Sequence, residues 1–570
     1  MVRLTIDGEQ VEVAEGTTIL EAARKLNVHI PTLCYHEDQA VKAVCRICVV
    51  EVEGQRLLPA ACSTPVSEGM VVKTASPKVI KARKNIMELI LARHPQDCLI
   101  CSKNGHCELQ KTAQDLNMYR PNRYELQLRT EKKDESSPSI VRDMSKCILC
   151  GRCMETCGKV QGIQVMAKEN RGFNTLVVPP YGKELVDTSC VNCGQCVQVC
   201  PVGALSIRDN TDDVYDQIAA GKTMVIQMAP SVRINLAECL GAKPGTVSTG
   251  KIIHALKKIG FSRVFDSDFS ADLTIMEEGT EFLKRLREGG SLPMFTSCCP
   301  AWVKYCETYG TDLLDHVSSA KSPQQMFGSV IKSYWAQREG LKREDICSVS
   351  VMPCTAKKFE CKRPEMKDDV DIVITVQELA KMIRTAGIDF DDLNDAEFDV
   401  PFGLGSGAAQ IFGITGGVME AALRTVYEVV TGKSLGERLE FAKVRGFEGI
   451  KEASLELDGM TVKVAVVHGL ANAKKMLELV RAGKADYQFI EIMACPGGCI
   501  GGGGNAPSTW KKLEARRDAI YQEDRNLPIR KSHENPYVQE LYKEFLGEPL
   551  GEKSHELLHT SYVSRKDLLR

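Results

Sequence analysis

Alternation of apolar and polar residues predicts a β-hairpin at the start of the chain. Val2 to Asp7 and Val11 to Ala14 alternate on either side of a glycine-containing turn. Thr18 and Glu21 have the spacing of a capping box, so we expect a helix that continues to about Leu26. A hairpin followed by a helix favours a small β-grasp domain.

From about residue 210 onward, the pattern changes to short apolar runs that alternate with helical stretches. Such alternation implies mostly parallel sheets with covering helices. We expect helices at 376–386 and 471–482 among others. The apolar runs, each a candidate strand, are Met224 to Met228, Leu292 to Thr296, Ser348 to Met352, Ile372 to Thr375, Val462 to Val467 and Phe489 to Met493.

Composition is that of an ordinary globular protein, with 43% hydrophobic and 26% charged residues in 570. The formal net charge of -2 gives no argument for a nucleic acid or an anionic membrane as partner. No run of 18 apolar residues occurs, so no membrane span is predicted. The first residues do not read as a signal peptide, and we expect a cytoplasmic location.

The 24 cysteines are the most informative residues. In a reducing compartment, closely spaced cysteines indicate metal sites rather than disulfides. Fifteen of them lie in the first 200 residues and nine in the remainder. This asymmetry predicts an electron-transfer part followed by a catalytic part.

The first cysteine set is Cys34, Cys45, Cys48 and Cys62. Its spacing is looser than that of plant-type ferredoxins. It resembles the [2Fe–2S] module of hydrogenases and of the large iron–sulfur subunit of respiratory complex I. A zinc ribbon is the alternative.

The second set combines one histidine with three cysteines: His94, Cys98, Cys101 and Cys107. By spacing alone it suits zinc about as well as iron. Among so many cluster motifs, a [4Fe–4S] site with one histidine ligand is favoured. His106 is an alternative ligand to His94.

The strongest signal is a repeated four-cysteine run typical of two-cluster ferredoxins, in which the fourth cysteine of each run ligates the other cluster. One [4Fe–4S] cluster is therefore assigned to Cys147, Cys150, Cys153 and Cys200. The second is assigned to Cys190, Cys193, Cys196 and Cys157.

Three further cysteine loops each follow a predicted strand: residues 296–302, 352–357 and 491–504. In open α/β sheets the ligand site lies outside the carboxyl ends of strands, so these loops can converge. Neighbouring side chains diverge, so at most one of Cys298 and Cys299 should ligate a given centre. Pro300 can open a helix there, which should lower the pKa of either thiol. Cys299, Cys354, Cys495 and Cys499 then supply the four thiolates of a [4Fe–4S] cubane.

These three loops closely resemble the three active-site signatures of [FeFe]-hydrogenases. The resemblance implies an H-cluster, in which the cubane is linked through Cys499 to a di-iron unit that carries CO and cyanide. It implies that Lys357 donates a hydrogen bond to a cyanide. The cavity would be lined by Pro230, Ser231, Gln324, Met352, Phe412 and Met493.

The resemblance also implies a proton path through Cys298, Glu278, Ser318, Glu281 and Arg285. Glu278, Glu281 and Arg285 have the i, i+3, i+7 spacing of one helix face. Arg285 cannot be deprotonated, so we expect it to gate the path or hold Glu281. On pattern alone, a solvated charged face is the alternative.

Two groups of residues remain outside these sites. Cys239, Cys306, Cys347 and Cys361 should be buried packing residues. The tail from Arg530 should wrap the catalytic domain, with its histidines at the surface or in packing roles.

The predicted fold is an α/β catalytic domain, with its H-cluster between lobes, preceded by α+β ferredoxin-like iron–sulfur domains. The expected domains are a [2Fe–2S] β-grasp domain at 1–78, a [4Fe–4S] domain with one histidine and three cysteine ligands at 79–126, a two-cluster [4Fe–4S] domain at 127–209, and an H-cluster domain at 210–570.

The predicted function is reversible reduction of protons to H2, with electrons relayed from ferredoxin through one [2Fe–2S] and three accessory [4Fe–4S] clusters. An alternative is the catalytic subunit of an NAD(P)-linked, possibly electron-bifurcating complex with flavin- or NAD-binding partner subunits. The chain carries no nucleotide-binding fingerprint of its own. A non-catalytic H2 sensor is a third hypothesis. H-cluster maturation proteins would be further partners.

Overall fold

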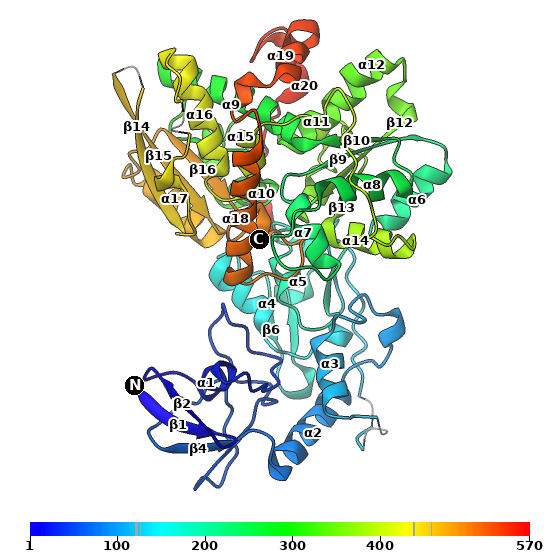
Figure 1. The fold of residues 1–570 in the computed structure, drawn as a ribbon, viewed down its shortest axis with the longest axis vertical. Helices are drawn as coiled ribbons and strands as arrows, with labels where there is room; N and C mark the ends of the chain where they lie inside the picture. The colour runs from blue at the N-terminus through cyan, green and yellow to red at the C-terminus, as the bar shows by residue number, and fades with distance from the viewer. Residues whose placement is uncertain (120–122, 126, 437–438, 458, 570) are drawn as a thin grey trace. The chain divides into compact units, whose positions relative to one another are not determined.

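The computed structural model describes residues 1–570 apart from 120–122, 126, 437–438, 458 and 570. The chain forms two compact units, whose course can be followed in Figure 1. The first unit comprises residues 1–158, 164–185 and 199–206. The second comprises residues 159–163, 186–198 and 207–570.

The first unit begins with a mixed four-stranded sheet packed against helix α1 (Ile19–Lys25). The predicted capping box is confirmed: Thr18 Oγ1 accepts from the Glu21 backbone N–H, and the Glu21 carboxylate accepts from the Thr18 N–H. The predicted hairpin is also confirmed, and the sheet order is that of a β-grasp. In spatial order the strands are β2 (Glu9–Val13), β1 (Val2–Ile6), β4 (Met70–Lys73) and β3 (Glu51–Val52).

The remainder of the first unit is built from short elements around the cysteine loops. Ser76 caps helix α2, and Pro77 at its first position suits a helix start because proline lacks the N–H that would be unpaired there. The elements are α2 (Pro77–Leu91), α3 (Glu108–Asp115), β5 (Ile140–Arg142), α4 (Arg152–Glu155), β6 (Ala167–Glu169) and β7 (Leu176–Val178), with β8 (Leu205–Ile207) where the chain passes into the second unit.

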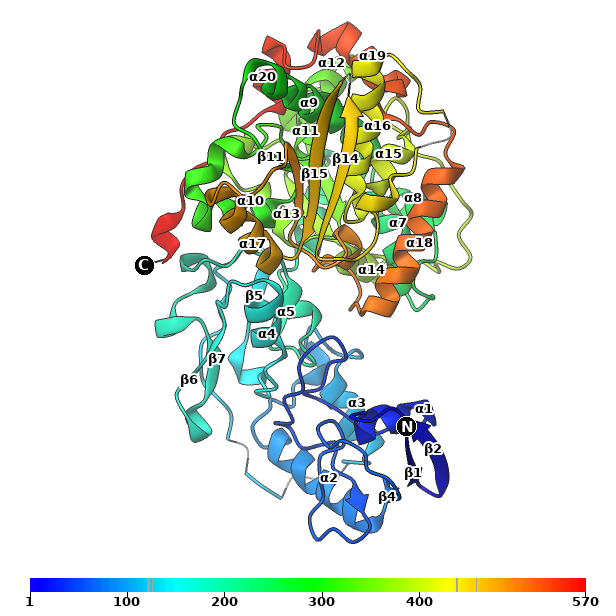
Figure 2. The same ribbon diagram turned by 90° about the vertical axis from the view of Figure 1, so that its left-hand side faces the viewer.

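Two four-stranded sheets organise the second unit. In the first sheet every pairing is parallel. In the second, three strands are parallel and β14 runs antiparallel to β15, as seen side by side in Figure 2. The orders are β10 (Arg263–Asp266), β9 (Thr223–Met228), β12 (Ile346–Met352), β13 (Ile372–Thr375) and β11 (Met294–Phe295), β16 (Phe489–Met493), β15 (Met460–His468), β14 (Ile450–Leu457).

All six predicted strands are present, although the second is shorter than expected because Pro293 has no N–H to donate to a ladder. Two strands of the second unit, β10 and β14, were not predicted from the sequence. Strand β10 has only four residues, and β14 is an edge strand that alternates apolar with charged residues.

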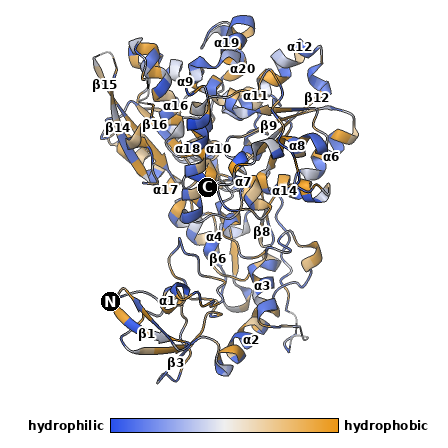
Figure 3. Ribbon diagram, in the orientation of Figure 1, coloured by the Kyte–Doolittle hydropathy of each residue, from blue (hydrophilic) through white to orange (hydrophobic). Residues whose placement is uncertain are grey.

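Helices cover both sheets, and apolar residues run along the strands and along the inner sides of many helices (Figure 3). Mostly parallel sheets with covering helices confirm the predicted α/β class. The helices of this unit are α5 (Gln195–Gln198), α6 (Thr211–Ala219), α7 (Val232–Cys239), α8 (Thr249–Ile259), α9 (Ser267–Glu288), α10 (Pro300–Tyr309), α11 (Pro323–Val330), α12 (Ala336–Glu339), α13 (Ala356–Glu360), α14 (Val376–Thr385), α15 (Gly407–Gln410), α16 (Gly417–Thr431), α17 (Leu470–Arg481), α18 (Trp510–Asn526), α19 (Pro536–Leu541) and α20 (Glu552–Leu558).

Within the described residues, no helix is both long and apolar enough to cross a bilayer. The four cysteines outside the cluster motifs pack among apolar side chains, as expected. Cys306, Cys347 and Cys361 are buried, and the partly buried Cys239 packs against the apolar cluster that contains Cys347 and Cys361.

The C-terminal segment is fastened to the second unit by buried polar contacts. Arg424 on α16 has no exposed surface and pairs with Glu420 at 2.6 Å and with Asp524 of α18 at 2.8 Å. Further along, Asn535 donates to Asp272 of α9 at 2.9 Å. The Asn535 contact and the hydrogen bond from Arg424 to the Arg530 carbonyl hold the start of the tail against the second unit. That the tail wraps the catalytic domain stays a prediction.

Arg424→Met is expected to destabilise the second unit, because it leaves two buried carboxylates without their shared cation. Breaking such a pair costs about 3–5 kcal/mol, and we expect the lower end because Arg445 and Arg530 still contact these acids. Calorimetry would measure this decrease in the free energy of unfolding. The matched control is Lys463→Met, whose pair with Asp486 is exposed and worth at most about 1 kcal/mol. Equal effects of the two substitutions would contradict this account.

Candidate active site

A buried cavity lies where strands of both sheets of the second unit end. The segments that follow β9, β11, β12 and β16 all contribute to its wall. Its volume is about 90 Å³, several times what one water molecule needs. Five thiols meet at this cavity: Cys298, Cys299, Cys354, Cys495 and Cys499.

The loop after β16 can turn back on itself only because of its glycines. At Gly498 the backbone φ is +91°, and an added Cβ would lie 2.5 Å from the Thr415 nitrogen. A side chain would therefore be both strained and sterically excluded. This turn lets Cys495 and Cys499 line the same cavity.

Burial affects the pKa values of the Cys298 and Cys299 thiols more strongly than the nearby helix N-terminus does. Cys299 is the N-cap of α10, with Pro300 at the first helical position. Burial raises the pKa of Cys299, although backbone N–H groups of Ala494 and Trp302 oppose it. Burial, then the charge of Glu278, raises the pKa of Cys298 well above its ordinary value. The expected lowering was wrong for the protein alone, because an apolar wall disfavours thiolate more than the helix end favours it.

All the residues predicted to line the site do contact this cavity. One of them, Ser231, is 1% exposed, and its hydroxyl has no hydrogen-bond partner in the described structure. A buried unpaired hydroxyl is uncommon unless a ligand or water satisfies it. Together with five thiols and an apolar wall, it fits a bound cluster. The lining residues are Pro230, Ser231, Gln324, Met352, Lys357, Phe412 and Met493.

Glu360, which was not predicted from the sequence, holds Lys357 in place. Its Nζ donates to Glu360 Oε2 at 2.9 Å and to the Cys298 carbonyl at 3.2 Å. Burial lowers the pKa of Lys357, but Glu360 and the thiols outweigh burial and raise it. Gln324 also donates to Glu360, at 3.2 Å. Lys357 is therefore a fixed cation at the cavity wall.

A chain of acids and hydroxyls leads from the cavity along α9. Glu278 accepts from the Ser297 backbone N–H at 3.2 Å, and it is buried. Ser318 lies close enough to Glu278 to lower its pKa slightly, and it donates to Glu281 Oε2 at 2.8 Å. Arg285 Nη2 donates to Glu281 Oε1 at 2.6 Å. The predicted path residues are thus neighbours from Glu278 to Arg285.

Glu278 is protonated over most of the neutral range. Burial raises its pKa to about 8, and the charge of Glu281 adds to that effect. A carboxyl group that carries a proton at neutral pH can donate as well as accept. This property is the one that a relay group requires.

Two other residues join this chain and had no signal in the sequence. The Ser319 backbone N–H donates to Glu281 at 3.0 Å, and its hydroxyl lies 2.8 Å from His559 Nδ1. His559 also contacts Glu277. Their separation of some 240 to 280 positions along the chain hides these contacts from any local pattern.

In the first unit, the set at 34–62 forms two hydrogen-bonded thiol pairs. Cys34 pairs with Cys45, which lowers the pKa of Cys34 to about 5. Cys48 pairs with Cys62, which lowers the pKa of Cys48 to about 7. The β-grasp loops therefore bring the four thiols together in two pairs.

At the second set, His94 is buried and its Nδ1 has no hydrogen-bond partner in the described part of the chain. His106, the alternative ligand, is exposed. Burial raises the pKa of Cys107, and the nearby Cys101 and Cys98 add to that effect. A buried imidazole nitrogen without a partner fits a ligand role for His94 better than an exposed ring does for His106.

The crossed assignment of the first ferredoxin cluster has a structural counterpart. One enclosed cavity in the first unit is lined by Cys147, Cys150, Cys153 and Cys200, and not by Cys157. In the second unit, the loop with Cys193 packs against the loop of the active-site cysteines. There Gln195 donates to the Gly501 carbonyl at 2.8 Å, and Thr355 donates to the Asn192 carbonyl at 2.6 Å.

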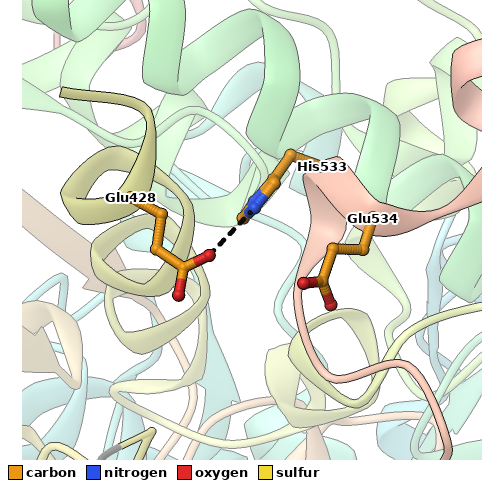
Figure 4. Close-up of side chains that lie close together, drawn as sticks. All are labelled: Glu428, His533 and Glu534. Atoms are coloured by element: carbon orange, nitrogen blue, oxygen red, sulfur yellow. Dashed lines mark ion pairs between the residues drawn. The ribbon is translucent and has the colours of Figure 1, made fainter. Parts of the chain in front are cut away.

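Another possible metal-ligand group of the second unit consists of Glu428, His533 and Glu534, of which the first two are partly buried and form an ion pair if His533 is protonated (Figure 4). Lys531 Nζ is already 3.0 Å from both Glu428 and Glu534. Because an ammonium group neutralises these carboxylates, the cluster is best explained as an ion-pair network that fastens the tail to α16.

Two proteins with similar sequences are hydrogenases, in agreement with the cysteine-lined cavity. Residues 222–503 match the family described as iron only hydrogenase large subunit, C-terminal domain. The NADP-reducing hydrogenase subunit HndD of Solidesulfovibrio fructosivorans is 50% identical over all of both chains. The chain belongs to the iron-only, or [FeFe], hydrogenase family. This hydrogenase is also 41% identical to iron hydrogenase 1 of Clostridium pasteurianum, over 99% of this chain and 100% of that one.

The remaining matches agree with iron–sulfur domains that precede a catalytic part in this hydrogenase. A structure of [FeFe]-hydrogenase HydA1 from Chlamydomonas reinhardtii aligns with a TM-score of 0.57 and 42% identity, over 63% of this chain and 99% of that one. Other parts match a 2Fe-2S iron-sulfur cluster binding domain (1–77), the NADH-ubiquinone oxidoreductase-G iron-sulfur binding region (83–121), a 4Fe-4S dicluster domain (146–204) and the iron hydrogenase small subunit (511–565).

The family confirms the predicted class: the chain is a hydrogenase catalytic subunit, an oxidoreductase that carries iron–sulfur domains ahead of an α/β catalytic part. Iron–sulfur matches in the first 204 residues favour iron over the zinc alternatives.

Glu278→Gln is expected to change how stability depends on pH. Between about pH 4.5 and 8, the native protein keeps a proton on Glu278, whereas the unfolded chain has already released it. The free energy of unfolding of the wild type therefore falls as pH rises through this window. The glutamine variant lacks that loss. Its melting temperature relative to wild type should therefore rise from pH 5 to pH 8, as calorimetry can measure. A difference that stays constant with pH would contradict the raised pKa.

Proposed function

We propose that this hydrogenase catalyses the reversible reduction of protons to H2 at the five-cysteine cavity. Cys299, Cys354, Cys495 and Cys499 would hold the cubane of an H-cluster, with Cys499 linking it to the di-iron unit. When bound, the cluster supplies the metal site at which electrons and protons combine. The observation that carries this proposal is a fifth thiol, Cys298, at the same cavity beside a relay of acids.

The protein's own residues would fix the cluster and exclude water. Lys357 would donate to a cyanide ligand, because Glu360 and the Cys298 carbonyl hold its ammonium at the wall. Met352, Met493 and Phe412 supply a soft apolar lining that keeps water out. Pro230, Ser231 and Gln324 complete the cavity, and the unpaired Ser231 hydroxyl is available to the bound group.

Protons would reach the cavity through the chain of neighbours along α9. Cys298 is the last donor and Glu278 supplies it, since the raised pKa keeps Glu278 protonated at neutral pH. Ser318 passes protons between Glu278 and Glu281. Arg285 holds Glu281, because a guanidinium group cannot itself give up a proton.

Electrons would arrive through one [2Fe–2S] and three accessory [4Fe–4S] clusters, with His94 as the nitrogen ligand of one. The packing of the Cys193 loop on the active-site loop supports a route from the last accessory cluster to the cubane. The domain boundaries 1–78, 79–126, 127–209 and 210–570 are part of the proposal. We place the protein in the cytoplasm, where thiolates stay reduced.

Ferredoxin is our first choice of electron partner. The alternative, an NAD(P)-linked complex with flavin- or NAD-binding subunits, is favoured by the 50% identity to a protein named as an NADP-reducing hydrogenase subunit. Gel filtration of the native enzyme separates the two, since only the alternative requires stable co-eluting subunits. A non-catalytic sensor is less well supported, because the thiol of Cys298 lines the cavity and the acids Glu278 and Glu281 are both present beside it. Dedicated maturation proteins would assemble the di-iron unit.

Cys298→Ala and Cys299→Ala are expected to fail in different ways. Cys299→Ala removes one of four cubane ligands, so the CO and cyanide infrared bands should be lost with the cluster. Cys298→Ala keeps every ligand but has no proton to give, and a positioned acid is worth ~10²–10⁴ in rate. It should keep the bands and lose nearly all H2 evolution and uptake. Substantial activity in Cys298→Ala would assign the proton role elsewhere.

Iron and sulfide analysis should fit five protein-bound clusters, one [2Fe–2S] and four [4Fe–4S] counting the cubane. The expectation rests on nineteen cysteines and His94 arranged in five ligand sets. His94→Ala should lower the iron content or change the EPR signal of one cluster, whereas His106→Ala should alter neither. Stoichiometric zinc in place of iron at any set would refute that assignment.

A further inference from the structure

Helix α2 carries an arginine in the middle of its buried face. Three residues of this helix are buried in the first unit: Val79, Arg83 and Met87. They stand four positions apart, so they share one face of the helix. Arg83 is 5% exposed. Because an arginine is almost never buried this deeply unless its charge is paired, its surroundings should supply a negative charge.

The contacts of Arg83 lead to the first cysteine set. Its Nη2 donates to the Val49 carbonyl at 2.8 Å. Val49 directly follows Cys48 and is itself buried. The buried Nε–H of Arg83 has no acceptor among the described residues. A buried N–H group without an acceptor is uncommon unless a bound group supplies one.

No carboxylate of the described residues forms an ion pair with Arg83. Burial lowers the pKa of Arg83 to about 10, and the negative charges of Cys48 and Asp7 oppose that effect. The Asp7 carboxylate already accepts hydrogen bonds from the backbone N–H and the hydroxyl of Thr74. Arg83 is therefore charged at neutral pH, in a place where an uncompensated charge is strongly unfavourable.

A [2Fe–2S] cluster is a counter-charge that fits this arginine. Two ferric ions, two sulfides and four thiolates have a net negative charge, and reduction of the cluster adds one more negative charge. A buried cation attracts the reduced form more strongly than the oxidised form, because Coulomb attraction grows with charge and is strong where water is excluded. Hydrogen bonds to the cluster sulfurs act in the same direction. Both effects raise the reduction potential.

We propose that Arg83 sets the reduction potential of the [2Fe–2S] cluster held by Cys34, Cys45, Cys48 and Cys62. Its buried charge stabilises the state in which the cluster has gained one electron from the redox partner. No proton moves and no bond to Arg83 forms or breaks in this step. Arg83 thus makes the cluster a better electron acceptor. The inference rests on the proposed cluster assignment and adds a residue that controls how readily this cluster takes up an electron.

The test is a reductive titration of the matured full-length enzyme with dithionite, in which EPR follows the [2Fe–2S] signal at a temperature that broadens the [4Fe–4S] signals. Arg83→Gln keeps an N–H donor for the Val49 carbonyl and removes the charge. The equilibrium constant for reduction of this cluster should fall at least tenfold, which is ~59 mV for one electron. Arg83→Lys keeps the charge and should retain most of the wild-type potential.

Arg83→Met is a second neutral variant, which matches the apolar side chains of Val79 and Met87 on the same helix face. It should lower the potential as Arg83→Gln does, and it provides the measurement if the glutamine variant does not retain the cluster.

Arg46→Gln is the matched control. Arg46 directly follows Cys45 but is exposed. Water and salt screen an exposed charge, whereas a buried pair is screened much less. Removal of Arg46 should therefore change the reduction equilibrium by less than about threefold, and added salt should abolish the change. The shift in Arg83→Gln should persist in high salt.

Three results would overturn the proposal: a wild-type potential in both neutral variants of Arg83; equal shifts in Arg83→Gln and Arg83→Lys, which would indicate packing rather than charge; or a shift in Arg46→Gln as large as that in Arg83→Gln. A wild-type enzyme without a [2Fe–2S] signal would refute the cluster assignment together with this proposal. Hydrogen chemistry is tested separately by Cys298→Ala, and an unchanged potential in the Arg83 variants would leave it standing.

Discussion

The convergence of strand ends from two mostly parallel sheets on one buried cavity is the constraint on which the rest of this hydrogenase depends. Segments after β9, β11, β12 and β16 meet there because parallel strands end at a common edge. Only this arrangement brings together thiols nearly 200 positions apart, such as Cys299 and Cys495. The glycine turn at Gly498 and the proline start of α10 are local devices that let each loop reach the cavity.

Burial at this convergence has two opposing consequences. It keeps Glu278 protonated, which suits a relay group, and it disfavours the charged form of the cavity thiols. Without a bound group the cavity is therefore a poor place for thiolates. Metal binding and deprotonation of these cysteines must occur together, because iron supplies the positive charge that an apolar wall cannot.

Helix α9 connects the cavity to the C-terminal segment. One side of it carries Glu278 and Glu281, while Glu277 accepts hydrogen bonds from Tyr542 and His559 of the tail. The tail therefore makes polar contacts with α9 in addition to covering apolar surface. It places His559, from the segment that matches the iron hydrogenase small subunit, in contact with Ser319, whose backbone N–H donates to Glu281.

The sequence by itself determined the α/β class, the six main strands and the identity of the cavity cysteines, because these depend on local periodicity and on motif spacing. It could not find Glu360 behind Lys357, nor Ser319 and His559 beside Glu281, since each is recruited by contact across the fold and has no motif. It also predicted the wrong direction for the pKa of Cys298 and Cys299. A helix N-terminus is visible in sequence, whereas the desolvation that overrides it exists only once the tertiary structure has closed around the thiols.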